Sequence, residues 1–140
     1  MASALVDTGA FVAWFDRSDA HHRRARAFFT SFEGSLVTTW PVLTETCHLL
    51  PPTVAIKFMR FMAEGHVGVI ELPAHAVGEV TRLMAKYLDR PMDLADASLV
   101  WAAEEAETTA VASVDRHDFA TYRTKSGKPF LNLFFPADHP

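Results

Sequence analysis

Four acidic residues are spaced along the chain so that an α/β fold would bring their carboxylates together. Asp7 follows the apolar run 4–6 and Asp115 follows the apolar run 111–114, whereas Glu45 and Asp96 lie near the starts of two predicted helices. The carboxyl ends of parallel strands and the helix starts that follow them share one edge of a sheet, where open α/β folds place their sites. Clustered carboxylates repel one another, and a divalent cation relieves that repulsion. The pattern therefore predicts metal-dependent phosphodiester chemistry.

The elements that must position these acids alternate along the chain. Short apolar runs predict strands over residues 4–6, 35–39, 67–72, 109–114 and 130–133. Helical patterns predict helices over 11–15, 21–32, 41–50, 53–63, 73–87 and 94–107, with one further turn around 118–120. This alternation predicts an α/β fold, with a central, mostly parallel sheet of four to five strands flanked by helices.

Composition sets the broad class of the protein. A chain of 140 residues with 49% hydrophobic and 21% charged residues is typical of one globular domain, expected over residues 1–140. No apolar run approaches the length of a membrane span and no signal peptide is visible at the N-terminus. A lone cysteine, Cys47, excludes an internal disulfide framework and favours a reducing, cytoplasmic location. The net charge of -4 argues against a broad nucleic-acid binder but not against a nuclease, because metal-binding acids contribute to it.

Four blocks of sequence resemble the signature blocks of PIN-domain proteins, and the VapC-type toxins are the nearest group. The blocks are LVDTGA at 5–10, LTE at 43–45, MDLADAS at 92–98 and SVDRHDF at 113–119, followed by a closing pattern over 122–133. Each block alone is common, but four in this order and at these separations are specific. One departure is that many relatives carry a glycine just before the fourth strand, where this chain reads Glu107-Thr108-Thr109. We expect this departure to alter a helix C-terminus and not the site.

The resemblance implies a PIN-like, Rossmann-like fold and an endoribonuclease that depends on Mg²⁺ or Mn²⁺. It assigns Asp7, Glu45, Asp96 and Asp115 as the catalytic and metal-binding quartet. Asp7 and Asp115 are expected to be direct ligands because strand ends are rigid, Asp96 is expected to be a ligand too, and Glu45 is expected to act through a water. The resemblance further implies an RNA substrate, a VapB-type antitoxin and a homodimer. The helices within 41–63 are the expected dimer surface.

Four neighbouring residues are expected to support the quartet. The hydroxyls of Thr8 and Ser113 are placed to orient Asp7 or a bound water. Asp93 is predicted to be a helix N-cap that also adds to the negative field around Asp96. Asp118 is predicted to be a turn or cap residue first and an outer acid second. Taken singly, each has an ordinary local role, so the site rests on their joint arrangement.

Other enzyme classes lack their motifs. A haloacid-dehalogenase-type phosphotransferase needs a second acid two positions after the first, where this chain has Gly9. Phosphate-binding loops, dinucleotide-binding loops and a nucleophilic serine elbow are also missing from the sequence. Two alternatives remain: a catalytically inactive PIN-like module that binds proteins, and a structure-specific DNA nuclease using the same metal chemistry. The sequence assigns no carboxylate as general base.

Overall fold

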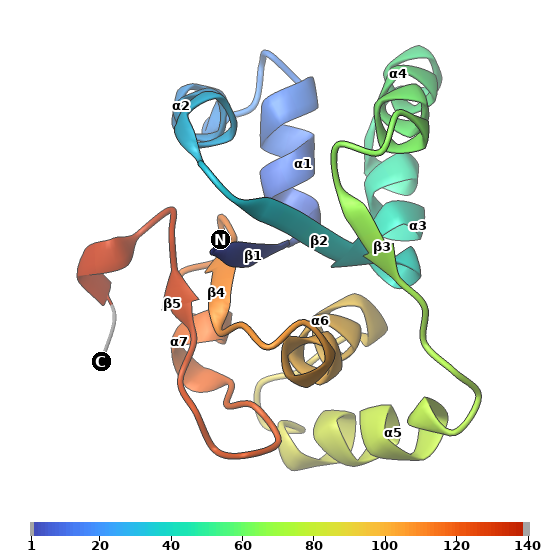
Figure 1. The fold of residues 1–140 in the computed structure, drawn as a ribbon, viewed down its shortest axis with the longest axis vertical. Coiled ribbons are helices and arrows are strands. Elements are labelled where there is room, and N and C mark those ends of the chain that lie inside the picture. Colours follow the sequence, from blue (N-terminus) through green and yellow to red (C-terminus); the bar gives the residue numbers. More distant parts are fainter. Residues whose placement is uncertain (1, 139–140) are drawn as a thin grey trace.

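The central element of the computed structural model, which describes residues 2–138, is a five-stranded sheet (Figure 1). All neighbouring strands run parallel, in the order β3-β2-β1-β4-β5. The strands are β1 (Ser3–Val6), β2 (Ser35–Thr39), β3 (Gly68–Ile70), β4 (Ala110–Ala112) and β5 (Leu131–Asn132). The predicted α/β fold with a parallel central sheet is confirmed. Of the predicted four to five strands, the structure has five.

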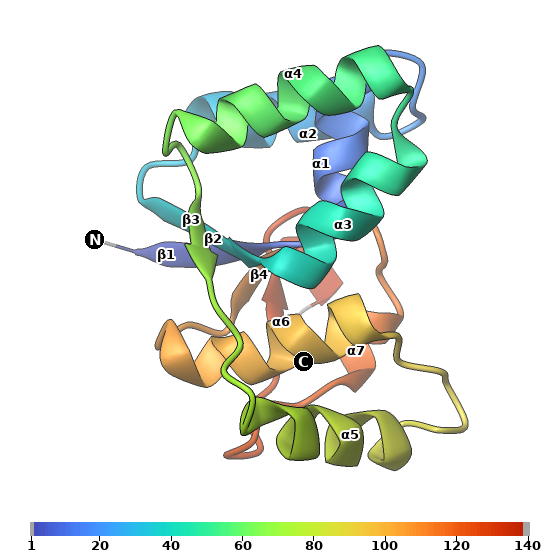
Figure 2. The same ribbon diagram turned by 90° about the vertical axis from the view of Figure 1, so that its right-hand side faces the viewer.

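Helices cover both faces of this sheet (Figures 1 and 2). On one side lie α1 (Thr8–Phe15), α2 (His22–Ser31) and α4 (Pro52–Ala63), and on the other lie α5 (Ala76–Lys86), α6 (Leu94–Glu105) and the short α7 (Asp118–Thr121). Helix α3 (Trp40–Leu49) leaves the end of β2 and contacts α1, α4 and α6. None of the helices between residues 2 and 138 has the length and apolar character needed to cross a membrane.

The strand order places a topological switch point between β1 and β4. The chain moves outward from β1 to β2 and β3, and then crosses back to add β4 and β5 on the other side of β1. Val6 is paired with Ala112, and the backbone N–H of Asp7 donates to the carbonyl of Ala112 at 3.0 Å. Open α/β sheets form their ligand crevices at such a point. Asp7 therefore occupies the position where this fold is most suited to a site.

Helix α1, which Asp7 caps, is fixed by an aromatic cluster. Ala4, Leu5 and Val6 of β1 are fully buried, as expected for a strand covered on both faces. On α1, Trp14 stacks on Phe29 with ring centroids 3.9 Å apart, and Phe11 meets Phe58 edge-on at 4.9 Å. These contacts join α1 to α2 and α4, so the cap residue at the start of α1 has little freedom to move.

Several predicted boundaries were wrong by a few residues. The helix predicted from Pro73 begins at Ala76, because the N–H groups of Ala76 and Val77 are used in a preceding turn. The fourth helix begins one residue before the predicted start at Thr53, and its cap position is Pro51. The third, fourth and fifth strands are shorter than the apolar runs that predicted them. Flanking apolar residues such as Val67 and Phe130 are buried without being part of the strand, so the length of the run overestimates the strand.

Glu107, in the stretch where many relatives carry a glycine, lies just after the C-terminus of α6, as predicted. Glu107 has a φ of 51°, which is the left-handed region that glycine adopts without penalty. The N–H of Thr108 donates to the carbonyl of Ala103 at 3.1 Å, the bond that closes a Schellman motif. The substitution therefore strains the end of the helix and leaves the start of α6, where Asp96 lies, unaffected.

We expect Glu107→Gly to raise the free energy of unfolding by roughly 0.5–1 kcal/mol, because glycine relieves the left-handed strain. Chemical denaturation of the two proteins measures the change. A loss of stability would show that the Glu107 side chain makes a compensating contact.

Gly9 allows α1 to approach the end of β4. A Cβ built at Gly9 would lie 2.3 Å from Cγ2 of Val114, a β-branched side chain with little rotational freedom. A side chain at this position would separate α1 from the segment that carries Asp115. The Asp-Thr-Gly sequence at residues 7–9 thus supplies an acid and a hydroxyl, and its glycine lets both lie close to the end of the neighbouring strand β4.

The two helical glycines 9 and 78 should respond oppositely to the same substitution. We expect Gly9→Ala to lower the free energy of unfolding by about 1–3 kcal/mol through overpacking. Gly78→Ala, on the exposed side of α5, meets only the end of Arg82 at 3.8 Å and should raise it by about 0.5–1 kcal/mol. Equal effects in urea denaturation would contradict the close-approach role of Gly9.

Candidate active site

Asp7 is held by two hydrogen bonds at the carboxyl end of β1. It is the N-cap of α1, and its Oδ1 accepts from the backbone N–H of Thr8 at 2.8 Å. Its Oδ2 accepts from the hydroxyl of Ser113 at 2.8 Å. Only 7% of the residue is exposed. Burial raises the pKa of Asp7 to about 7, although these two hydrogen bonds oppose the change and the charges of Glu45 and Asp93 add to it.

Ser113 connects the ends of β1 and β4. Its fully buried hydroxyl donates to Asp7 and accepts from the backbone N–H of Asp115 at 3.0 Å. The backbone of Ser113 is held in turn by Asn132 of β5, whose side chain accepts from the Ser113 N–H at 3.2 Å and donates to its carbonyl at 3.0 Å. This role of Asn132 was not predicted from the sequence. The available signal was a polar residue within the apolar run 130–133.

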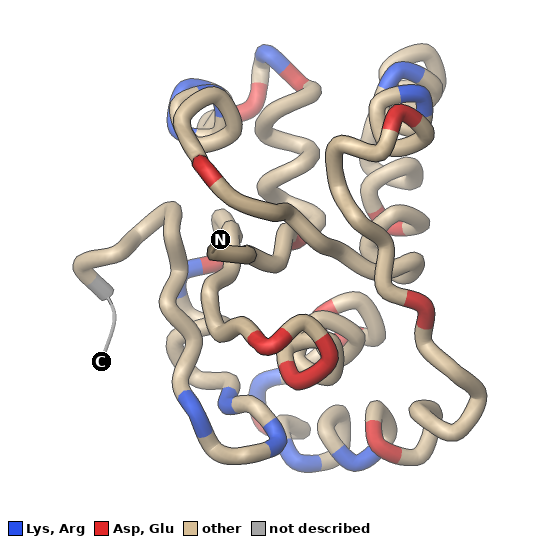
Figure 3. Tube along the Cα trace, viewed as in Figure 1, with Lys and Arg blue, Asp and Glu red and all other residues tan. Residues whose placement is uncertain are grey.

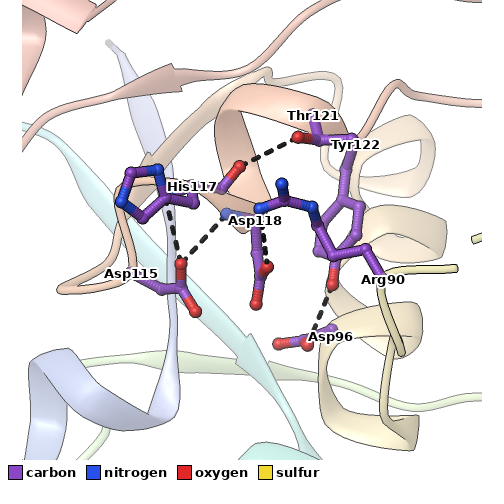
Figure 4. Close-up of polar contacts among 7 residues, drawn as sticks. All are labelled: Arg90, Asp96, Asp115, His117, Asp118, Thr121 and Tyr122. Carbon is purple, nitrogen blue, oxygen red and sulfur yellow. Dashed lines mark hydrogen bonds and ion pairs between the residues drawn. The ribbon is translucent and has the colours of Figure 1, made fainter.

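Asp115 and Asp118 form a turn after β4 (Figure 4). Oδ1 of Asp115 accepts from the backbone N–H groups of His117 at 3.1 Å and Asp118 at 2.9 Å. Burial alone would raise the pKa of Asp115, but the hydrogen bonds from Asp118 and these amides lower it. Burial and the neighbouring Asp115 raise the pKa of Asp118 to about 6, against the effect of Arg90, whose Nη1 lies 3.7 Å away. Asp115 is thus the acid of this pair that ionises more readily.

Asp93 and Asp96 lie at the start of α6. Asp93 is the N-cap, and its Oδ1 accepts from the N–H of Asp96 at 2.8 Å, as predicted. Oδ2 of Asp96 accepts from the hydroxyl of Tyr122 at 3.3 Å (Figure 4). Burial raises the pKa of Asp96 to about 8, with further contributions from the charges of Asp7, Asp93 and Asp118. The helix start therefore presents a carboxylate that the surrounding acids make costly to ionise.

Glu45 reaches the same region from α3. Burial raises the pKa of Glu45, the hydroxyl of Thr8 opposes that change, and the charge of Asp93 adds to it. The Thr8 hydroxyl is buried and makes no hydrogen bond of normal geometry within residues 2–138. It is a polar atom facing the acids with capacity for a further partner, such as a water bound to an ion.

The structure brings all eight predicted site residues to one edge of the sheet. The electrostatic coupling runs from Glu45 to Asp7, from Asp7 to Asp96 and from Asp96 to Asp118, which adjoins Asp115. Lys and Arg residues are carried mainly by α2, α4, α5 and the segment 123–128 (Figure 3). With the side chains as they lie in residues 2–138, no group of three or more Asp, Glu, His or Cys residues is close enough to hold a metal ion. Oxygen donors without thiolate or imidazole suit Mg²⁺ or Mn²⁺.

An acidic edge at the switch point of a parallel sheet is the site expected of an open α/β enzyme domain. The chain matches the PIN domain family over residues 4–125 and belongs to that family. It is 26% identical over 130 residues to Ribonuclease VapC26 of Mycobacterium tuberculosis, an alignment covering 90% of this chain and 96% of that protein. Its fold is similar to the crystal structure of VapC20 from the same organism, described as a Sarcin-Ricin loop cleaving toxin. The TM-score is 0.75 at 18% identity, over 83% of this chain and 92% of the other. The family resemblance read from the four sequence blocks is confirmed.

The raised pKa values predict how the metal-free protein responds to pH. Asp7 and Asp96 have folded-state pKa values of about 7 and about 8, against 3.8 for an ordinary aspartate. The folded state therefore holds more protons than the unfolded state between these values, and its stability falls as the pH rises toward 8. In EDTA we expect a lower Tm at pH 8.5 than at pH 6.

Asp7→Asn should remove much of this pH dependence, because asparagine keeps the cap and cannot ionise. At pH 8.5 in EDTA we expect the variant to be more stable than the parent by roughly 2–4 kcal/mol. Glu105→Gln, at the exposed end of α6, removes one charge outside the cluster and is the matched control. Parallel pH profiles for parent and Asp7→Asn would contradict the raised pKa.

Proposed function

We propose that this PIN-domain protein is an endoribonuclease that uses Mg²⁺ or Mn²⁺ to hydrolyse RNA phosphodiester bonds. The observation that carries the proposal is the meeting of Asp7, Glu45, Asp96 and Asp115, from four separate segments, at the β1/β4 switch point. Burial and neighbouring charges raise the pKa of two of them, Asp7 to about 7 and Asp96 to about 8. Acids that only stabilised the fold would be paired with bases, because unpaired buried carboxylates are unfavourable. This cluster is suited to a cation.

The quartet divides the work of holding that cation. Asp7, Asp96 and Asp115 would contact it directly, and Glu45 would act through a water. Mg²⁺ commonly retains waters in such sites. When bound, the cation supplies an activated water and offsets the charge that develops on the phosphate. Asp7 and Asp115 present fixed oxygens, because each accepts two hydrogen bonds from rigid neighbours.

RNA is favoured over DNA as the substrate by the relative named Ribonuclease VapC26, and the similar fold of VapC20, a Sarcin-Ricin loop cleaving toxin, agrees with a VapC-type protein. A structure-specific DNA nuclease would use the same carboxylates. An inactive protein-binding module is the weaker alternative, because all four acids are present and share one edge.

The same relatives support the toxin of a toxin–antitoxin pair, with a VapB-type antitoxin as partner. We also infer a homodimer that uses the face formed by α3 and α4. On this face Leu49 and Ile56 are more than half exposed. Burying large apolar side chains of this kind is a common source of dimer stability.

Cleavage of pooled total RNA by the purified protein tests the proposed function. We expect discrete fragments with Mg²⁺ or Mn²⁺ and none with EDTA. Asp7→Asn and Asp96→Asn should each slow cleavage on the order of 100-fold or more, because each removes a negative oxygen from the cation site. Glu105→Gln again serves as the control and should cleave at the parent rate.

The same assay separates the alternatives. Single-stranded and branched DNA substrates, tested beside the RNA, distinguish a DNA nuclease. Failure of the folded protein to bind Mn²⁺ or to cleave any of these substrates would refute the proposal and favour the protein-binding module. Cleavage at the parent rate by Asp7→Asn would show that the site lies elsewhere.

A further inference from the structure

The acids of the quartet differ in how their carboxylates are oriented. Asp7 accepts hydrogen bonds from Thr8 and Ser113, and Asp115 accepts from two backbone amides of its own turn. Asp96 sits on the first turn of α6, where its own N–H is used by Asp93. The Asp96 carboxylate accepts a hydrogen bond from the hydroxyl of Tyr122. Its orientation therefore depends on a residue 26 positions away in the sequence.

Tyr122 is well suited to hold a fixed direction. It is fully buried at the C-cap of α7, and its ring lies edge-on to Tyr87 at 5.0 Å and to Phe119 at 5.4 Å. Tyr87 is itself tied down, because its hydroxyl accepts from the backbone N–H of Arg123 at 2.9 Å. The Tyr122 phenol cannot rotate without disturbing both rings. Figure 4 shows the Tyr122 hydroxyl pointing toward the Asp96 carboxylate.

Without this hydroxyl, the charges around Asp96 would decide where its carboxylate points. Asp7 and Asp118 both act on Asp96 with like charge, so repulsion favours a rotamer turned away from the cluster. A neutral hydroxyl fixed by aromatic packing counters that repulsion without adding a positive charge that would compete with a cation. This combination is what a ligand-orienting residue requires.

We propose that Tyr122 is a positioning residue that holds Asp96 in the orientation needed to bind the divalent cation. This inference rests on the proposed metal-dependent function and extends it to a residue outside the acidic set. In this proposal Tyr122 has no contact with the substrate. It acts only through Asp96, by linking the start of α6 to the end of α7.

Tyr122→Phe tests the inference, because it removes the hydroxyl and retains the ring. We expect the Kd for Mn²⁺, measured by direct titration, to rise roughly 10-fold or more, in the range found when partners that orient a ligand are removed. Cleavage at limiting Mn²⁺ should fall in parallel, and excess Mn²⁺ should recover most of the lost rate. The Tm in EDTA should remain within a few degrees of the parent.

Tyr87→Phe is the matched control, since it removes a tyrosine hydroxyl in the same aromatic group that contacts backbone instead of an acid. Because the Tyr87 ring that packs on Tyr122 remains, this variant should change Mn²⁺ affinity much less than Tyr122→Phe does. Parent-like Mn²⁺ affinity in Tyr122→Phe, with the parent binding and cleaving normally, would overturn the inference and leave the proposed function intact. Equal losses in the two variants, or a loss that excess Mn²⁺ does not recover, would also overturn it by assigning the effect to packing. If the parent binds no Mn²⁺, the proposed function and the inference both fail.

Discussion

The repulsion among carboxylates at the β1/β4 switch point is the constraint on which the rest of the structure depends. Burial raises the pKa of Asp7 and Asp96, and each acid makes the ionisation of its neighbours more costly. A globular domain is stable by only about 5–15 kcal/mol, so a cluster of this kind must be compensated locally. The compensation comes from donors attached to regular elements. Ser113 at the end of β4 and the first N–H of α1 both donate to Asp7.

The donors stabilise the ionised form of some acids in the cluster more than that of others. Asp115 is stabilised as an anion by the amides of its own turn, so its pKa is lowered, whereas the pKa of Asp96 is raised. One edge of the sheet thus holds both readily ionised and reluctantly ionised acids. Near neutral pH the charge of the cluster is then incomplete in the absence of a cation, and a cation would draw the remaining protons off. Binding of a cation and full ionisation of the site are therefore a single linked equilibrium.

The sequence predicted the fold and the location of the acids because these depend on local signals. An apolar run ending in an acid predicts where Asp7 and Asp115 lie, and a cap pattern predicts Asp93. The contributions of Tyr122 and Asn132 were not predicted, because each depends on a partner far away in the chain. A buried tyrosine and a strand asparagine have many ordinary uses, and only tertiary packing shows which polar atom each one meets. Strand and helix ends were also misplaced, since burial extends beyond the hydrogen-bonded ladder.

The acidic quartet, unlike the Tyr122–Asp96 and Asn132–Ser113 contacts, joins parts of the chain that lie on opposite sides of the β1/β4 switch point. Asp7 and Glu45 follow β1 and β2, whereas Asp96 lies in the connection from β3 to β4, and Asp115 and Tyr122 follow β4. Neither part alone contains a complete acidic quartet. A cation bound across the switch point would therefore stabilise the assembled sheet and not either half, since a ligand stabilises only the state that binds it. The repulsion that makes the metal-free edge unfavourable is the same interaction that would make cation binding strong.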